Sequence, residues 1–340
     1  MKSFSSPLLA WYKIHKRDLP WRRTKDPYKI WLCEIIMQQT RVAQGLAYYN
    51  RFVEKFPSPR ALAQASEDQV LKLWQGLGYY SRARNLHAAA KSMKGTFPKT
   101  YQEVRALKGV GDYTAAAICS IAYDMPYAVV DGNVYRVLAR VLGISTPIDS
   151  TDGKKQFSAL AQDLLDVKHP GDYNQALMDL GAMVCTPQTP LCEGCPLSKM
   201  CQARKTGTQM NFPVKSQKTK ISTRYFHYIY VVQGKSTWLH RRGAGDVWQN
   251  LYELPLIETQ SDVLSFKYPQ LKKWFGAVPL QQISKTPVKH VLSHQVIYAR
   301  LYKVVLPPSH PVASGFIKVS TQKIGGYAIP RLVQKLLEQV

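Results

Sequence analysis

The sequence has few acidic residues for its size. Its 340 residues include 22 Asp and Glu against 46 Lys and Arg, which gives a formal net charge of +24. No acidic residue lies between Glu193 and Asp246, whereas ten Lys and Arg do. Basic side chains gain affinity for polyanions by displacing the cations condensed on phosphates. A nucleic acid is therefore the expected partner. The alternative is that the charge serves only solubility, and in either case net charge says nothing about the fold.

Long apolar runs are also missing. No stretch approaches the ~18 apolar residues that a membrane span needs. No basic amphipathic helix or lipidation motif favours a membrane surface. The first 23 residues hold a short apolar piece followed by five basic residues, unlike a secretory signal. We therefore expect a soluble, intracellular protein that does not associate with membranes.

The length and the apolar pattern predict two domains. Up to about residue 205, apolar residues recur at helical spacing, interrupted by turns such as the one at Gly76 and Gly78. The stretch 206–224 has the composition of a basic linker. Beyond it, a hairpin around Gly234, a strand over 295–306 and a helix after Pro330 are expected. The prediction is an all-α domain over 1–205 and a smaller α+β domain over 225–340.

Four of the six cysteines fall within 17 residues. These four, separated by six, two and five residues, are Cys185, Cys192, Cys195 and Cys201. Disulfides are disfavoured in a basic intracellular protein, so thiolates at this density indicate a metal site. Their chemistry leaves open Zn²⁺ in a four-thiolate site and an iron–sulfur cluster. Cys33 and Cys119 stand alone in helical patterns and are expected to be buried.

A lone carboxylate stands in the apolar stretch "LCEIIMQQT", residues 32–40. No Lys or Arg lies within one helical turn of Glu34. Burial without a cationic partner raises the pKa of a carboxyl group, which can then donate a proton near neutral pH. The alternative is a hydrogen-bonded structural glutamate.

Two further stretches have a chemical and a structural interpretation. In "LKGVGDYTAAAICSIA", residues 107–122, Gly109 and Gly111 allow a tight turn between helices. The free amides at the start of the second helix can then bind a phosphate; the alternative is that the turn only connects the two helices. Asp131 and Asn133 precede another helix, where the structural role would be capping.

These features together resemble the helix–hairpin–helix DNA glycosylases related to endonuclease III. The resemblance rests on the Gly-Val-Gly turn, on Asp131 about twenty residues after it, and on the cysteine spacing. Within that family, "LPWR" (19–22), "DPYKIWLCEIIMQQTRV" (26–42), "GLGYYSRARNLH" (76–87) and "NQALMDLGAMVC" (174–185) resemble the MutY-type adenine DNA glycosylases. The match covers residues 7–205 and is weaker beyond them, where "GAGDVWQNLYELPL" (243–256) is similar to their Nudix-like domain.

The resemblance implies a base excision repair enzyme that carries a [4Fe-4S] cluster on the four cysteines, 185–201. Its substrate would be duplex DNA in which adenine is mispaired with 8-oxoguanine or guanine, and the adenine would be flipped out for hydrolysis. It also implies a monomer in the bacterial cytoplasm, at the nucleoid. The residues that the resemblance assigns to catalysis are Glu34 as general acid and base, Asp131 as the group that stabilises the oxocarbenium ion or traps it covalently, and Tyr113 and Asn133 as their supports.

The resemblance also assigns contacts with the DNA and the bases. Relatives that cleave the strand place a lysine at the position of Tyr113, so hydrolysis without strand cleavage is expected. The acidic Nudix box is missing, which disfavours a pyrophosphate hydrolase. In "HVLSHQ" the chain has Leu292 where the family usually has an aromatic residue. The implied contacts are Trp21, Arg22 and Gln175 around the adenine; Gln39 and Thr40 on the distorted duplex; Tyr79 as a wedge; Gly109 and Gly111 on the backbone; and Ser293 and His294 on 8-oxoguanine.

Two other functions compete with this interpretation. A glycosylase of the endonuclease III type acting on oxidised pyrimidines would be favoured by a lysine at position 113 and by the absence of a second domain. An iron–sulfur DNA-binding protein without activity would be favoured by loss of Glu34 or Asp131. The sequence has neither pattern.

Overall fold

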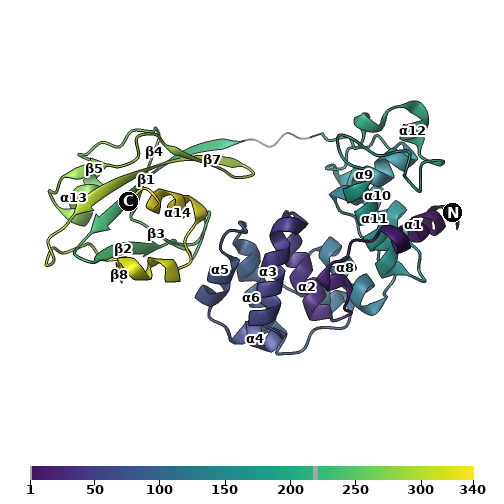
Figure 1. The fold of residues 1–340 in the computed structure, drawn as a ribbon, viewed down its shortest axis with the longest axis horizontal. Coiled ribbons are helices and arrows are strands. Elements are labelled where there is room, and N and C mark those ends of the chain that lie inside the picture. Colours follow the sequence, from purple (N-terminus) through teal and green to yellow (C-terminus); the bar gives the residue numbers. More distant parts are fainter. Residues whose placement is uncertain (1, 217–220) are drawn as a thin grey trace. The chain divides into compact units, whose positions relative to one another are not determined.

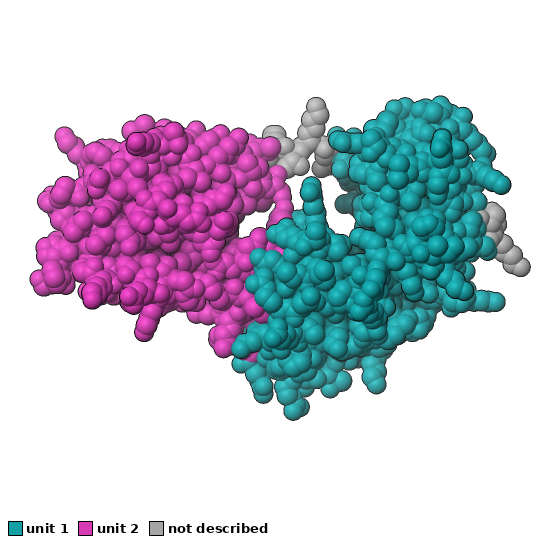
Figure 2. All heavy atoms as spheres, in the orientation of Figure 1, with its two compact units in different colours: residues 1–64, 85–217 teal, residues 65–84, 218–340 magenta. Residues whose placement is uncertain are grey.

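The chain forms two compact units (Figures 1 and 2). The computed structural model describes residues 2–216 and 221–340. The first unit comprises 1–64 and 85–217, and the second comprises 65–84 and 218–340. The segment 65–84, which the sequence pattern assigns to the helical domain, thus belongs by its contacts to the second unit. The domain limits expected from the sequence stay a prediction, and residues 217–220 of the expected linker lie outside the described residues.

The first unit is helical, as the sequence predicts. One of its apolar clusters joins the first helix of the chain to the three long helices between 132 and 183. No described helix is long and apolar enough to cross a membrane. The elements are α1 (Lys2–His15), η1 (Pro20–Arg22), α2 (Pro27–Met37), α3 (Val42–Lys55), α4 (Pro59–Gln64), α6 (Ser81–Ser92, shared between the two units), α7 (Tyr101–Ala106), α8 (Asp112–Tyr123), α9 (Gly132–Leu142), α10 (Thr151–Leu164), α11 (Pro170–Met183), α12 (Gln202–Thr206) and η2 (Gln209–Asn211).

Local sequence sets both ends of α2. The Asp26 side chain accepts a hydrogen bond from the Tyr28 amide at 2.9 Å, and Pro27 occupies the first turn, where its missing N–H has no partner to lose. After Met37 the chain turns, and Gln39 adopts a left-handed backbone with φ 55°. The helix packs between α3 and α8 (Figure 1), and seven of its eleven residues are buried. An ionisable side chain on this helix therefore lies in an apolar environment.

Helices α9 and α11 approach each other closely where Gly181 meets Asn133. A Cβ atom on Gly181 would lie 2.5 Å from the Asn133 Cβ, a distance that real side chains do not adopt. The start of α9 is fixed by Asp131, whose side chain caps the helix, and its end by Gly143, with φ 68°. This packing determines where the first residues of α9 point.

The described part of the expected basic linker, 206–216, packs on the first unit. The Ile148 amide donates to the Val214 carbonyl at 3.0 Å, and the Ser216 amide donates to the Asp149 carboxylate at 2.9 Å. Arg140 also donates to the carbonyls of Gln209 and Phe212. This stretch is therefore tied to helical neighbours over most of its length.

The second unit is α+β, as predicted. Strands β1 and β7 are parallel, in register from Ser222 opposite Gln295 to Val232 opposite Val305. One sheet has the order β4-β1-β7-β5, with β6 also paired to β7, and the other has the order β3-β2-β8. The elements are α5 (Glu67–Trp74), β1 (Ser222–Val232), β2 (Ser236–Arg241), β3 (Tyr252–Glu253), β4 (Leu256–Thr259), α13 (Pro269–Phe275), β5 (Leu280–Gln282), β6 (Val288–Val291), β7 (Gln295–Val305), β8 (Phe316–Ser320), η3 (Thr321–Gly326) and α14 (Arg331–Leu337).

Of two local predictions for this unit, the last helix is confirmed, whereas the hairpin forms only as a turn. Gln233 and Ser236 close the turn between β1 and β2 through backbone hydrogen bonds, but the two strands belong to different sheets, and among the described residues they are paired only by this isolated bridge. The last helix, α14, follows Pro330 and contacts β6 and β7 (Figure 1). Val340 lies beyond the end of the helix and is exposed.

Candidate active site and nucleic-acid interface

Glu34 on α2 is an acid with a shifted pKa. Burial raises the pKa of Glu34 to about 7, and the charge of Asp131 adds to this increase. A hydrogen bond with the Tyr113 hydroxyl and the charge of Arg22 act in the opposite direction. The Glu34 carboxyl can therefore exist in its protonated form near neutral pH. Glu34 can act as a proton donor or as a base within a narrow range of pH.

Tyr113, in the first turn of α8, faces both carboxylates of the site. Burial, together with the charges of Glu34 and Asp131, raises the pKa of its phenol well above the usual range. The phenol therefore remains protonated and serves as a hydrogen-bond donor. Its oxygen also lies 3.6 Å from the sulfur of Met178 on α11. The structure thus brings together three side chains that sequence analysis assigned to catalysis.

Asp131 does cap α9, and the cap also orients its carboxylate. Its Oδ1 accepts a hydrogen bond from the Val134 amide at 2.8 Å, and its Oδ2 accepts one from Asn133 Nδ2 at 2.8 Å. Burial raises the pKa of Asp131, while these two hydrogen bonds lower it because they favour the ionised form. The structural role and a chemical role therefore coexist in one side chain.

Asn133 is itself held by an arginine that reaches the cysteine segment. Arg136 Nη2 donates to Asn133 Oδ1 at 2.8 Å and to the Gly181 carbonyl at 2.6 Å. Its Nε donates to the Cys185 carbonyl at 2.7 Å. The orientation of Asp131 thus depends, through Asn133 and Arg136, on the backbone at Cys185.

A buried carboxylate fixes Arg22. Asp179 on α11 accepts hydrogen bonds from Arg22 at 2.5 and 2.8 Å and from Arg17 at 2.5 and 2.8 Å. The side chain of Asp179 is fully buried, and both arginines lower its pKa against the effect of burial. Trp21 packs edge-on against Tyr49, with 5.1 Å between the ring centroids.

The turn after α2 and the glycine turn before α8 present backbone and polar groups. Gln39 is exposed, and the Thr40 hydroxyl donates to the Gln38 carbonyl at 3.3 Å. Gly109 has φ 83°, and a Cβ there would lie 2.8 Å from the Asn85 Cβ, so the position requires glycine. A Cβ on Gly111, the cap residue of α8, would meet nothing within 4 Å. A ligand can therefore approach this helix terminus closely.

The four clustered cysteines line one small cavity. Arg140 Nη1 lies 3.4 Å from the Cys185 sulfur, and Gln209 Nε2 lies 3.8 Å from the Cys192 sulfur. In the described part of the chain, no three His, Cys, Asp or Glu side chains are arranged to hold a metal ion. Four thiols around one cavity, with N–H donors on two of them, nevertheless fit the donor set of an iron–sulfur cluster. The residues on its wall include Cys185, Cys192, Cys195, Cys201, Val137, Leu180, Arg140 and Gln209.

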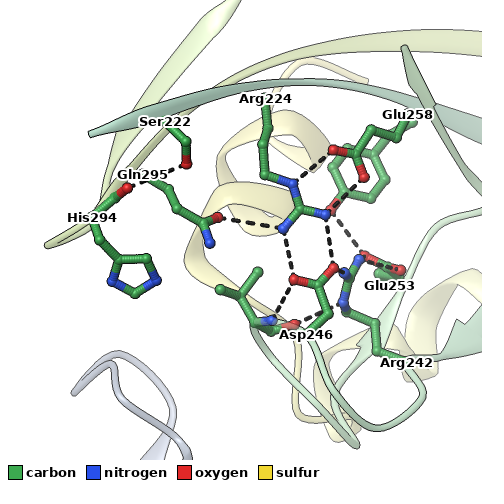
Figure 3. Close-up of polar contacts among 10 residues, drawn as sticks. Ser222, Arg224, Arg242, Asp246, Glu253, Glu258, His294 and Gln295 are labelled. Atoms are coloured by element: carbon green, nitrogen blue, oxygen red, sulfur yellow. Dashed lines mark hydrogen bonds and ion pairs between the residues drawn. The ribbon is translucent and has the colours of Figure 1, made fainter. Parts of the chain in front are cut away.

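In the second unit, the stretch "LSHQ" forms a tight turn between β6 and β7. The Leu292 amide donates to the Gln295 carbonyl at 2.8 Å, which leaves Ser293 and His294 exposed at the tip. Ser222 at the start of β1 donates to the His294 carbonyl through its amide at 3.0 Å and through its hydroxyl at 3.3 Å (Figure 3). This turn is therefore anchored to the adjacent strand.

Tyr79 and Ser293 are hydrogen-bonded to each other through their hydroxyls, although 214 positions separate them in the sequence. Tyr79 has a left-handed backbone with φ 45°, follows Gly78 with φ 75°, and is 46% exposed. Two residues that sequence analysis assigned to contacts with the DNA thus meet in one place.

Sequence reasoning missed several residues that hold the site. Asp179 was missed even though it carries a signal similar to that of Glu34, a carboxylate among apolar residues in "ALMDLGAMV". Arg136 and Arg140 recur four positions apart in the otherwise apolar "VYRVLARVL", which is a similar signal. Their partners are distant in sequence, so the signal indicates burial but not the partner.

The raised pKa of Glu34 predicts a stability that depends on pH. The ordinary value is 4.5 and the folded value about 7. The stabilising contribution of the protonated form is therefore complete below about pH 4.5 and is lost as the pH rises through 7. Glu34→Gln removes this dependence. We expect the difference in Tm between the variant and wild type to increase by several degrees in favour of the variant from pH 5 to pH 8. This corresponds to a change in the free energy of unfolding on the order of 1–3 kcal/mol.

Differential scanning calorimetry at the two pH values measures this difference. Glu54→Gln, an exposed position on α3, is the matched control and should show the same difference from wild type at both pH values. An unchanged difference for Glu34→Gln as well would mean that the Glu34 carboxyl is not desolvated.

Comparisons with known proteins identify the family of the chain. The model of the HhH-GPD superfamily of base excision DNA repair proteins matches residues 32–165, and the NUDIX domain model matches 227–339. The chain is 32% identical over 347 residues to the adenine DNA glycosylase of Buchnera aphidicola subsp. Acyrthosiphon pisum, covering 98% of this chain and 97% of that protein. It is 46% identical over 216 residues to the human adenine DNA glycosylase, covering 60% of this chain and 40% of that protein. The match thus spans about two fifths of the human relative.

Solved structures resemble the first part of the chain. A thermostable thymine-DNA glycosylase is 31% identical with a TM-score of 0.56, and the match covers 60% of this chain and 96% of that one. Endonuclease III in a non-covalent DNA complex, at 20% identity and a TM-score of 0.51, shares the fold. With a relative aligned along nearly the whole length of both sequences, the chain belongs to the adenine DNA glycosylase family.

Proposed function

We propose that the chain is a base excision repair enzyme that hydrolyses the N-glycosidic bond of adenine mispaired with 8-oxoguanine, and also with guanine, in duplex DNA. The observation that carries the proposal is the pKa of Glu34, about 7, beside Tyr113 and Asp131. The net charge of +24 supports a DNA partner. The family membership supports adenine as the base that is removed.

Glu34 acts first as the acid. Adenine inside a duplex is out of reach, so it must be flipped out of the stack before the reaction. Adenine is a poor leaving group as an anion, and a proton on its N7 makes it a good one. The protonated Glu34 carboxyl supplies that proton, and the ionised carboxylate that remains can then activate water.

Asp131 faces the positive charge that develops on the sugar. A carboxylate beside the reacting carbon stabilises an oxocarbenium ion or traps it covalently, as in the hydrolases that use two carboxyl groups. The hydrogen bonds from Asn133 and from the Val134 amide favour the ionised form of Asp131 against the effect of burial. Arg136 fixes Asn133 and is therefore a positioning residue.

The reaction ends with hydrolysis and does not cleave the strand. A Schiff base with the sugar requires an amine, and position 113 carries a phenol that remains protonated. In this role Tyr113 orients Glu34 by a hydrogen bond and does not attack. The chain is then a monofunctional glycosylase.

The DNA contacts are assigned to groups of both units. Gln39 and Thr40 contact the distorted duplex, and the amides after Gly109 and Gly111 bind a backbone phosphate. Trp21, Gln175 and Arg22 line the site for the flipped adenine, and Asp179 fixes Arg22 there. In the second unit Tyr79 inserts beside 8-oxoguanine, and Ser293 and His294 bond to its added oxo and N–H groups.

The cysteine cavity would hold a [4Fe-4S] cluster through Cys185, Cys192, Cys195 and Cys201. The cluster would supply a structural crosslink for the segment 185–201, and no reaction step is assigned to it. The glycosylase domain is proposed to span 1–205, the linker 206–224 and the Nudix-like recognition domain 225–340. The enzyme would act as a monomer on DNA in the cytoplasm, at the bacterial nucleoid.

The catalytic assignment predicts the effect of two isosteric substitutions. Glu34→Gln keeps the shape of the side chain but cannot donate the proton, so adenine release should fall by at least about 100-fold while DNA binding remains nearly intact. Asp131→Asn should likewise bind DNA without cleaving the glycosidic bond. Single-turnover assays on an adenine:8-oxoguanine duplex measure release, and a gel-shift assay measures binding.

The substrate is tested in the same assays with wild-type protein. Duplexes that carry thymine glycol, or thymine opposite guanine, are the control substrates, and neither should be processed at a comparable rate. Substantial adenine release by Glu34→Gln would remove Glu34 from its role. Faster processing of thymine glycol would favour the endonuclease III type of activity.

The phenol at position 113 predicts that no Schiff base forms. Wild-type protein treated with borohydride during turnover should give no covalent adduct with DNA, and Tyr113→Phe should give none either. Denaturing gel electrophoresis of labelled DNA detects such an adduct. Efficient trapping would show that a lysine elsewhere attacks the sugar, and the hydrolysis-only mechanism would then be wrong.

The cysteine cavity predicts iron and not zinc. Anaerobically purified protein should be brown and contain about four irons per chain, as for a [4Fe-4S] centre held by four thiolates. Cys192→Ser should weaken folding or DNA binding, whereas Cys119→Ser, at a cysteine remote from the cavity, should retain the iron. Metal analysis by mass spectrometry that finds stoichiometric zinc and no iron would overturn the assignment.

A further inference from the structure

Tyr79 and Ser293 come from two distant segments of the second unit, and their contact depends on what holds those segments together. Tyr79 precedes α6 in the segment 65–84, and Ser293 lies in the turn between β6 and β7. Both residues are exposed and end in flexible hydroxyl-bearing side chains. A single hydrogen bond between exposed side chains contributes little by itself. Their placement therefore needs support from the backbone segments that carry them.

On the side of Ser293, the support is Arg224 of β1. All five N–H groups of its guanidinium have acceptors (Figure 3). Two bonds go to Glu258, both at 2.7 Å, and two go to Asp246, at 2.6 and 2.8 Å. The fifth goes to Gln295 Oε1 at 3.3 Å, at the end of the Ser293 turn. The guanidinium cannot rotate without losing several charge-assisted hydrogen bonds.

Asp246 belongs to the loop 243–250, which has an unusual backbone. Trp248 and Asn250 adopt left-handed conformations, with φ 61° and 66°. Such conformations in residues other than glycine cost on the order of 1 kcal/mol each and persist only where surrounding contacts enforce them. Here Asp246 accepts hydrogen bonds from Arg224, from Arg242 at 2.5 Å and from the Val247 amide at 2.7 Å. The ion pairs thus impose the shape of the loop.

The far end of this loop binds the segment that carries Tyr79. Arg84 donates to the Gln249 carbonyl at 2.9 Å and to Gln249 Oε1 at 3.3 Å. Asn250 Nδ2 donates to Glu67 Oε1 at 2.6 Å, at the start of α5. Arg84 lies on α6, five positions after Tyr79. The loop 243–250 therefore holds the helices on both sides of Tyr79.

These contacts form a closed ring. We propose that Arg84 and Asp246 are positioning residues that keep Tyr79 against Ser293 and thereby set how strongly the enzyme prefers 8-oxoguanine over guanine opposite the adenine. This inference rests on the proposed function, in which Tyr79 and Ser293 contact that base. In order, the ring consists of Ser293, Gln295, Arg224, Asp246, Gln249, Arg84 and Tyr79.

The adjacent cavity gives no competing explanation for these charges. It has a volume of about 500 Å³ and is lined in part by Asp246, Glu253 and Glu258. Each of these carboxylates is already paired with an arginine, Glu253 with Arg242 at 2.9 Å and the other two with Arg224. Because each of these three carboxylates is paired with an arginine, none of them is available to bind a cation in the cavity. The charges therefore serve to hold the loop.

Arg84→Met tests the inference, because it removes the bond to Gln249 and retains the length of the side chain. We expect the ratio of single-turnover rates for adenine:8-oxoguanine over adenine:guanine, at subsaturating enzyme, to fall by roughly 5- to 50-fold. The rate on adenine:8-oxoguanine at saturating enzyme should stay within about twofold of wild type, because the carboxyl groups of the first unit are untouched. Arg84→Lys, which keeps one donor for the Gln249 carbonyl, should retain most of the preference.

Arg331→Met is the matched control, since Arg331 lies on α14 of the same unit and bonds to Gln334 and Glu338, outside the ring. It should leave the ratio unchanged. If Arg84→Met does not fold, as judged by its thermal melt, Asp246→Ala removes the bonds of the loop to Arg224 and Arg242 and takes its place. A variant that folds and keeps the full preference overturns the inference.

A double-mutant cycle with Ser293→Ala separates this inference from the proposed function. If Arg84 acts through Ser293, the preference of Arg84→Met/Ser293→Ala should equal that of Ser293→Ala alone. If the double variant loses preference by the product of the two single-variant factors, Arg84 acts independently of Ser293, which contradicts the inference. If Ser293→Ala itself retains the full preference, the proposed reading of 8-oxoguanine by the Ser293 turn fails, whatever Arg84 does.

Discussion

A carboxyl group placed in an apolar helix without a cation of its own is the constraint on which the first unit depends. Glu34 retains a pKa of about 7 only as long as no arginine pairs with it. Arg22, whose charge acts on Glu34, is bound on both nitrogens to the buried Asp179. Asp179 thus keeps Arg22 near the site and also pairs with its guanidinium, so that this guanidinium is not free to form an ion pair with Glu34. The pKa of Glu34 therefore depends on a residue of another helix.

The parts that sequence could predict are those whose cause is local. The ends of α2 and α9, the turn between β1 and β2 and the shift of the Glu34 pKa all follow from residues within a few positions, whereas the assignment of β1 and β2 to different sheets does not. The cap by Asp131 is a similar case, because Asp, Ser, Thr and Asn at a helix start have one dominant structural use. The neighbouring residues could not decide whether Asp131 caps the helix or acts in catalysis. In the structure the two roles are compatible, because one carboxylate can serve both.

What sequence could not predict are pairings between distant residues. Arg17 and Asp179 are 162 positions apart, and Tyr79 and Ser293 are 214 apart. Arg224 reads as one more base in a stretch without acidic residues, yet it is the centre of an ion-pair cluster whose acids come from two later segments. Charge composition indicated a polyanion as the partner of these bases and gave no sign that some of them serve the fold instead.

Helix α11 sets the positions of side chains on three other elements of the first unit. Met178 touches Tyr113 of α8, Asp179 holds Arg22 of η1, and Gly181 makes room for Asn133 of α9. Because each residue advances an α-helix by about 100°, a one-residue insertion or deletion in α11 upstream of these positions would turn all three away at once. A point substitution disturbs one of these contacts, whereas a change in length disturbs all three, so the number of residues in α11 is itself a functional property of the chain.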